Sequence, residues 1–129
     1  MRVRCVGGIV LDEAGRLLMV RRGHPPDEGL WSIPGGRVEP GEDDPAAVAR
    51  ELKEETGLDV VAGAKAGSVE RPGPDGIVYE IHDYTAAVTG GTLRAGDDAS
   101  DVRWISPDEL CGLPVTPGLL DALILWDLL

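Results

Sequence analysis

The sequence has few basic residues and no run of them, which excludes one large class of partner. Its 12 Lys and Arg residues stand against 23 Asp and Glu residues, giving a formal net charge of −11. Binding to duplex nucleic acid without sequence preference depends on basic side chains that neutralise phosphates, so we expect no such partner. This charge does not exclude a small nucleotide that is held through metal ions.

Cysteine is also scarce, and long apolar runs are absent. Cys5 and Cys111 are far apart and belong to no CxxC motif, so we expect neither a zinc site nor a disulfide scaffold. We interpret both as reduced thiols of a cytoplasmic protein. The N-terminal segment has no apolar run of signal-peptide length, and the apolar residues 119–129 are too few to cross a bilayer. No membrane partner is therefore expected.

The remaining composition suits a single globular domain. The chain has 129 residues, of which 43% are hydrophobic, and this is enough for a core without disulfides. We find no internal repeat, low-complexity segment or linker. Residues 1–129 are therefore predicted to form one domain.

Turn residues and apolar patterning divide the chain into short elements. Strands are predicted over residues 2–11, 16–22, 37–39, 58–62, 66–70, 77–89 and 102–105. Helices are predicted over residues 43–56 and 117–129, with a short one starting at 106–109. The central helix has the clearest ends, with Asp43 and Asp44 as candidate caps, Pro45 in the first turn and Gly57 after the last. This order of elements indicates an α/β fold with a mixed β-sheet packed between helices.

The central helix carries a crowded group of charges. Glu51, Glu54 and Glu55 fall within one helical turn, where like charges on one face repel each other. A hard divalent ion such as Mg²⁺, which takes oxygen ligands and usually works with phosphate groups, would relieve that repulsion. It would also lower the pKa of bound water. The turn therefore indicates a metal site, and the plain alternative is a solvated charged face.

Residues near the helix could complete such a site. Gly35 and Gly36 allow the backbone to approach a ligand closely, although turn requirements alone would also account for them. Arg50 neighbours the acidic group and can hold a carboxylate in a bidentate pair. Glu42 is a plausible partner for it across the loop.

The order and spacing of these residues resemble the Nudix box at every defined position, Gly36-x5-Glu42-x7-Arg50-Glu51-Leu52-x-Glu54-Glu55-x-Gly57-Leu58. The first hairpin and residues 30–36 and 104–110 are also similar to the family, so the resemblance covers nearly the whole chain. It implies an α/β/α sandwich with a mixed β-sheet. It also implies hydrolysis of a nucleoside diphosphate linked to another moiety, with water attacking a phosphorus of the pyrophosphate.

The resemblance also implies a role for each residue of the box. The implied ligands of Mg²⁺, or of Mn²⁺ as a substitute, are Glu51, Glu54, Glu55 and the carbonyl of Gly35. The implied structural support of the site is Gly36, Glu42, Arg50 and Gly57. The general base would be a box glutamate or an acid of a later loop, among Asp97, Asp98 and Asp101. Of these three we prefer Asp101 as the base. The alternative is that Asp101 is an ordinary acidic residue at the end of a strand.

The box does not select the substrate. Pro74 lies 74 − 58 = 16 residues after Leu58, where enzymes resembling ADP-ribose pyrophosphatases often carry a proline, so ADP-ribose or a similar diphosphate is placed first. An ordinary hairpin turn would also explain that proline. The alternatives are a MutT-like hydrolase of oxidised or non-standard nucleoside triphosphates, a nucleotide-binding module without turnover, and an acidic structural domain.

Further substrate contacts are predicted at three positions near the first hairpin. Arg21 and Arg22 end a strand and could meet substrate phosphate or base, or could simply be solvated there. Trp31 could stack on a base, although packing is the plainer reading. The predicted partner is a small-molecule nucleotide, and the family resemblance is compatible with a homodimer.

Overall fold

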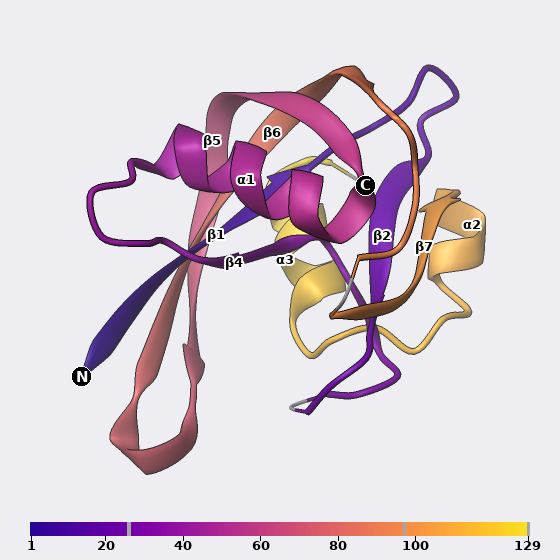
Figure 1. Cartoon of the computed structure of the whole chain (residues 1–129). Coiled ribbons are helices and arrows are strands. Elements are labelled where there is room, and N and C mark those ends of the chain that lie inside the picture. The colour runs from indigo at the N-terminus through magenta and orange to yellow at the C-terminus, as the bar shows by residue number, and fades with distance from the viewer. Residues whose placement is uncertain (26, 97, 129) are drawn as a thin grey trace.

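Two β-sheets form the middle of the fold in the computed structural model, which describes residues 1–25, 27–96 and 98–128 (Figure 1). The first sheet has the order β4-β1-β6-β5 and contains β1 (Arg2–Ile9), β4 (Gly35–Arg37), β5 (Leu58–Pro72) and β6 (Val78–Gly91). The second has the order β3-β2-β7 and contains β2 (Leu17–Arg22), β3 (Trp31–Ser32) and β7 (Ala99–Ile105). The first sheet is mixed, because β1 runs parallel to β6 and antiparallel to β4.

Helices cover both sides of these strands (Figure 1). They are α1 (Asp44–Thr56), α2 (Pro107–Leu110) and α3 (Leu119–Leu125), and a 3₁₀ turn, η1 (Pro74–Gly76), closes the β5–β6 hairpin. The predicted α/β/α sandwich with a mixed β-sheet is confirmed, with the strands divided between two sheets. In the described part of the chain, no helix has the length and apolar character needed to cross a membrane.

Alternate residues of β1 and β2 point to opposite faces and divide the core in two. One cluster packs against α1 and contains Val6, Val10, Leu18, Ala47, Val48, Leu52, Leu58 and Val60. The other packs against α2 and α3 and contains Ile9, Leu17, Met19, Trp31, Ile105, Leu110, Leu119 and Leu123. The apolar face of α1 is therefore fully buried against the strands, and this fixes the position of its acidic face.

The ends of α1 lie where the sequence predicts them. Asp43 is the N-cap and accepts a hydrogen bond from the Ala46 amide at 2.9 Å. Gly57 follows the last turn with a φ of 77°, in the left-handed region that favours glycine. The loop between β6 and β7 then covers this end, because the amides of Arg94 and Gly96 donate to the last carbonyls of α1.

Several element boundaries differ from the prediction, and three of them have clear reasons in the tertiary structure. β4 begins at Gly35, earlier than expected, because Gly35 and Arg37 pair with β1. β5 is one strand where two pieces were predicted, since register shifts between Ala62 and Gly67 allow pairing with β6 to continue. The last helix is shorter than predicted and starts after Gly118, whose φ is 84°.

Candidate active site

The acidic face of α1 lies against the backbone that enters β4. A Cβ atom on Gly36 would lie 2.5 to 2.6 Å from the carboxyl atoms of Glu51, so glycine leaves the space that this carboxylate occupies. The Gly35 amide donates a hydrogen bond to Oε2 of Glu55 at 3.0 Å. Two successive glycines therefore position two of the three glutamates in the acidic turn of α1.

Arg50 links α1 to the loop before it through several hydrogen bonds. Its guanidinium makes a bidentate pair with Glu42, at 2.7 and 2.8 Å, and donates to the Arg37 carbonyl at 2.9 Å. The hydrogen bonds from Arg50, together with one from the Glu39 amide, lower the pKa of Glu42 to about 2. Nη1 of Arg50 also lies 2.9 Å from Oε1 of Glu51. The structure thus brings Arg50 and Glu42 together with Glu51.

Glu51 and Glu55 line a cavity of about 490 Å³. Its other lining residues are Val20, Arg22, His24, Ser32, Ile33, Gly35, Gly36, Arg37, Asp98 and Ala99. Burial is the main cause that raises the pKa of both carboxyls, in the case of Glu55 to about 8. Two acids whose charged forms are disfavoured therefore face one cavity.

Glu54 is arranged differently from Glu51 and Glu55. Its side chain is 58% exposed, and its Oε2 lies 3.3 Å from Nη1 of Arg50. Within the described ranges, no three His, Cys, Asp or Glu side chains form a preformed metal cluster. The guanidinium of Arg50 instead lies against both Glu51 and Glu54.

The donor groups at this cavity nevertheless fit a hard divalent cation. Glu51 and Glu55 offer only oxygen ligands, and the glycine backbone approaches both. A bound cation would also offset the cost of burying the two charged carboxyls. On these grounds the residues present can hold Mg²⁺ or Mn²⁺.

The structure places Asp98 and Asp101, two of the candidate acids of the later loop, on different sides of the sheet. Asp98 lines the cavity, and its Oδ1 lies 3.6 Å from Nε2 of His24. Asp101 pairs with Arg21, whereas the neighbouring Val20 lines the cavity, so Asp101 projects from the opposite face of the sheet.

The side chain of Asp101 is held on that face by Arg103. Both Nε and Nη2 of Arg103 lie 2.9 Å from its Oδ2. Asp101 is therefore not brought to the glutamates. The third candidate, Asp97, lies outside the described residues.

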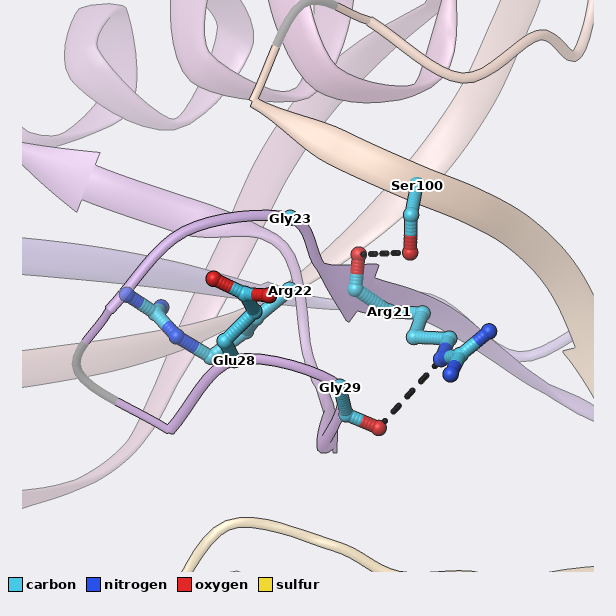
Figure 2. Close-up of a pocket in the computed structure, with 6 residues that line it drawn as sticks. All are labelled: Arg21, Arg22, Gly23, Glu28, Gly29 and Ser100. Atoms are coloured by element: carbon cyan, nitrogen blue, oxygen red, sulfur yellow. Dashed lines mark hydrogen bonds between the residues drawn. The ribbon is translucent and has the colours of Figure 1, made fainter.

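The residues predicted to contact the substrate do not all lie at the cavity. Figure 2 shows Arg21 and Arg22 pointing to opposite sides of β2. Both arginines line a hollow of about 170 Å³ beside Glu28, but of the two only Arg22 also lines the main cavity. Arg21 donates to the Gly29 carbonyl at 3.3 Å. Trp31 is 5% exposed and belongs to the second core cluster.

Pro74 lies in the turn at the tip of the β5–β6 hairpin, which extends away from α1 (Figure 1). It is not among the residues that line the cavity. Of the four predicted contacts, all within the described part of the chain, Arg22 alone lines it.

Several cavity residues were not assigned a role in the site from the sequence. Ser32, Ile33 and Arg37 come from β3, β4 and the segment between them, and His24 comes from the loop after β2. They meet because β3 pairs with β2 in one sheet and β4 pairs with β1 in the other. Their place at the cavity could not be predicted from the sequence, since it depends on these two pairings.

An acidic helix face beside a glycine-bordered cavity defines a candidate hydrolase of phosphate compounds. Residues 1–123 match the NUDIX domain, and the chain belongs to the Nudix family. The resemblance to the Nudix family, first seen in the box, is therefore confirmed. The solved structure of the Escherichia coli ORF135 protein is 30% identical, with a TM-score of 0.79, and the match covers 98% of this chain and 91% of that one.

Relatives of this chain bear several substrate names. A putative 8-oxo-dGTP diphosphatase of Bacillus subtilis (strain 168) is 40% identical over 79% of the chain and 65% of its own length. The CTP pyrophosphohydrolase of Escherichia coli (strain K12) is 32% identical over 92% and 87%. The ADP-ribose pyrophosphatase of Methanocaldococcus jannaschii is 36% identical over 78% and 60%. The chain thus spans less than two thirds of the first and third of these proteins.

Proposed function

We propose that this protein is a divalent-metal-dependent pyrophosphohydrolase that cleaves the pyrophosphate bond of a nucleoside triphosphate. The observation that carries the proposal is the pair of half-buried carboxyls, Glu51 and Glu55, which face one cavity beside the backbone of Gly35 and Gly36. Membership of the Nudix family and relatives named as pyrophosphohydrolases support it.

Mg²⁺ is the proposed cofactor, with Mn²⁺ as a substitute. Glu51, Glu54, Glu55 and the Gly35 carbonyl would hold it. When bound, such an ion neutralises phosphate charge and lowers the pKa of its water. Glu54 can turn toward the cavity, because its side chain is exposed and its contact with Arg50 is a single one of 3.3 Å.

The chain's own residues would orient these groups and the substrate. Arg50 ties α1 to the loop through Glu42 and the Arg37 carbonyl, so the carboxylate of Glu51 is presented in one position. Arg22 brings a positive charge to the cavity wall, where a guanidinium can bind phosphate oxygens.

Asp98 replaces Asp101 as the proposed acid of the later segment. It lines the cavity with Glu55, whereas Asp101 is held on the other face of the sheet by Arg103. As a general base, Asp98 would accept a proton from the attacking water, a role that contributes about 100-fold or more to a rate.

A pair of substitutions tests this assignment. We expect Asp98→Asn to lower kcat by about 100-fold and Asp101→Asn to leave it near the wild-type value. The measurement is steady-state hydrolysis across pH, since loss of a base also removes its limb of the pH profile. A full loss in the Asp101 variant with an active Asp98 variant would reverse the assignment.

The nucleoside triphosphate is placed ahead of ADP-ribose for two reasons. Of the three relatives described above, the one named for 8-oxo-dGTP has the highest identity, and the one named for CTP has the widest coverage. Pro74, the clue for ADP-ribose, lies at a hairpin tip outside the cavity lining. ADP-ribose is the second candidate, because a relative bears that name.

The purified protein should be incubated with Mg²⁺ or Mn²⁺ and a panel of substrates, and the products identified. The panel contains nucleoside triphosphates with normal and oxidised bases, ADP-ribose, diadenosine polyphosphates and sugar nucleotides. We expect a nucleoside monophosphate and pyrophosphate from a triphosphate. The Glu51→Gln variant, prepared identically, controls for contaminating phosphatases. A folded sample that turns over no member would favour a binding module without catalysis.

A further inference from the structure

Arg37, which lines the cavity, is held by an uncharged side chain. It lies in β4, and its side chain is exposed. Its Nη2 donates a hydrogen bond to the hydroxyl of Tyr79 at 3.2 Å, and its guanidinium carbon lies 5.6 Å from the centroid of the Tyr79 ring. In the described part of the chain, this hydroxyl is the only hydrogen-bond partner of the guanidinium.

This arrangement leaves the positive charge of Arg37 available to a ligand. By contrast, Arg50 is paired with the carboxylate of Glu42, and Arg103 with that of Asp101. A carboxylate beside a guanidinium offsets its charge, whereas an aromatic ring attracts the cation without adding a negative charge. A guanidinium with free N–H donors matches the oxygens of a phosphate group. The contacts of Arg37 therefore suit a residue that binds phosphate.

The backbone of Arg37 is fixed next to the glutamates of α1. Its strand pairs with β1, and its carbonyl accepts a hydrogen bond from Nη2 of Arg50 at 2.9 Å. The preceding residue, Gly36, lies against the carboxylate of Glu51. Arg22 brings a positive charge to the same cavity from the other sheet. A ligand with several phosphate groups offers negative charge to both arginines.

Tyr79 is itself held by the β5–β6 hairpin. It lies in β6 and pairs with Arg71 of β5 and with Val3 of β1. A Cβ atom on Gly73 would lie 2.5 Å from the Tyr79 ring, so the ring packs directly on the backbone of that turn. The hairpin extends away from α1 (Figure 1), but through Tyr79 it contacts a residue of the cavity lining. An arginine that is already ordered loses less conformational entropy when it binds a ligand.

We propose that Tyr79 is a positioning residue, which holds Arg37 so that the guanidinium binds a phosphate group of the substrate. Tyr79 acts through Arg37 and does not itself touch the reacting atoms. The inference rests on the proposed function and extends it, because it adds a phosphate-binding residue and its support to the site. It also gives the β5–β6 hairpin a role in substrate binding.

Binding of inorganic tripolyphosphate with Mg²⁺, measured by calorimetry, tests the proposal with a ligand that has no base. We expect Arg37→Gln to weaken binding roughly 10- to 100-fold, the effect of a hydrogen bond to a charged group. Tyr79→Leu, which removes both the hydroxyl and the ring, should weaken it roughly 10-fold. Tyr84→Phe is the control, because it removes the only other tyrosine hydroxyl of the chain, which donates to Asp44 at 2.6 Å. This control should bind as the wild type does.

The double variant shows whether Tyr79 acts through Arg37. In the Arg37→Gln background, Tyr79→Leu should change the affinity by less than about twofold. A merely structural role of Tyr79 would instead give the same loss in both backgrounds. If Tyr79→Leu does not fold, Tyr79→Phe serves in its place, with an expected loss of roughly threefold or more.

Three results would overturn the proposal. They are equal losses in both backgrounds, an affinity that Arg37→Gln leaves unchanged, and no binding of tripolyphosphate by the wild type. Because binding is measured without turnover, the proposed activity can fail separately. A protein that binds tripolyphosphate through both residues but cleaves no substrate of the panel would contradict that activity and leave the contact between Arg37 and phosphate standing.

Discussion

Replacement of Gly36 by Ala tests the construction of the site with a single methyl group. The added Cβ would lie 2.5 to 2.6 Å from the carboxyl atoms of Glu51, and ordinary van der Waals contact begins at 3.4 Å. The carboxylate must therefore move by 3.4 − 2.6 = 0.8 Å to 3.4 − 2.5 = 0.9 Å. The end of a flexible side chain can make that movement, so the backbone need not.

The expected result is loss of activity in a stable protein. A misplacement of about 1 Å at an active site costs roughly 100-fold in rate. Gly36 is not among the residues with positive φ, so Ala strains no backbone there, and the stiffer unfolded chain contributes about 0.4 to 1 kcal/mol of stability. We expect the unfolding temperature to stay within about 4 °C of the wild type.

The measurements are kcat/KM for the best substrate, the midpoint of its metal dependence, and the unfolding temperature. Gly35→Ala is the matched control, because its Cβ would meet the carbonyl of Val6 and lie 2.8 Å from the Cα of Gly7. Backbone cannot move aside, so this variant should be strongly destabilised. A Gly36→Ala protein that keeps kcat/KM within about threefold of the wild type would refute the reasoning.

Two further changes test charge. Glu54→Gln should remove most activity and leave the unfolding temperature near the wild-type value or above it, because it relieves repulsion from neighbouring glutamates; full activity would contradict its role at the metal. Asp44→Asn should cost about 2 kcal/mol at pH 7, because hydrogen bonds from Arg4 and Tyr84 help to lower the Asp44 pKa from 3.8 to about 2. That stabilisation is present above pH 3.8 and is lost as the pH falls toward 2, so denaturant melts of both proteins should converge there. A gap that persists at pH 2 would show that charge is not its cause.

Local features of the sequence were enough to predict α1 and the box. The cap at Asp43, the stop at Gly57 and the spacing of the glutamates all act over three or four residues, within reach of helix hydrogen bonds. The pairing of Arg50 with Glu42 spans eight residues and was accessible from the family pattern.

The orientation of side chains on the strands was not accessible in this way. Successive strand residues face opposite sides, so a single residue of register decides whether an acid reaches the cavity. Asp101 was preferred over Asp98 from its spacing to Trp104, and the pairing of β2 with β7 places it on the other face. Pro74 likewise had the spacing from the box that is typical of ADP-ribose pyrophosphatases, but its hairpin extends away from α1.

The sequence by itself determined the family, the sandwich fold and the acidic turn, because each depends on contacts between residues close in the chain or on a motif of fixed spacing. The tertiary structure alone decided which residues share a cavity with that turn. Ser32, Ile33 and Arg37 reach that cavity through pairing of β3 with β2 and of β4 with β1. Pairing between segments so far apart is set by the packing of the whole core, which no local pattern contains.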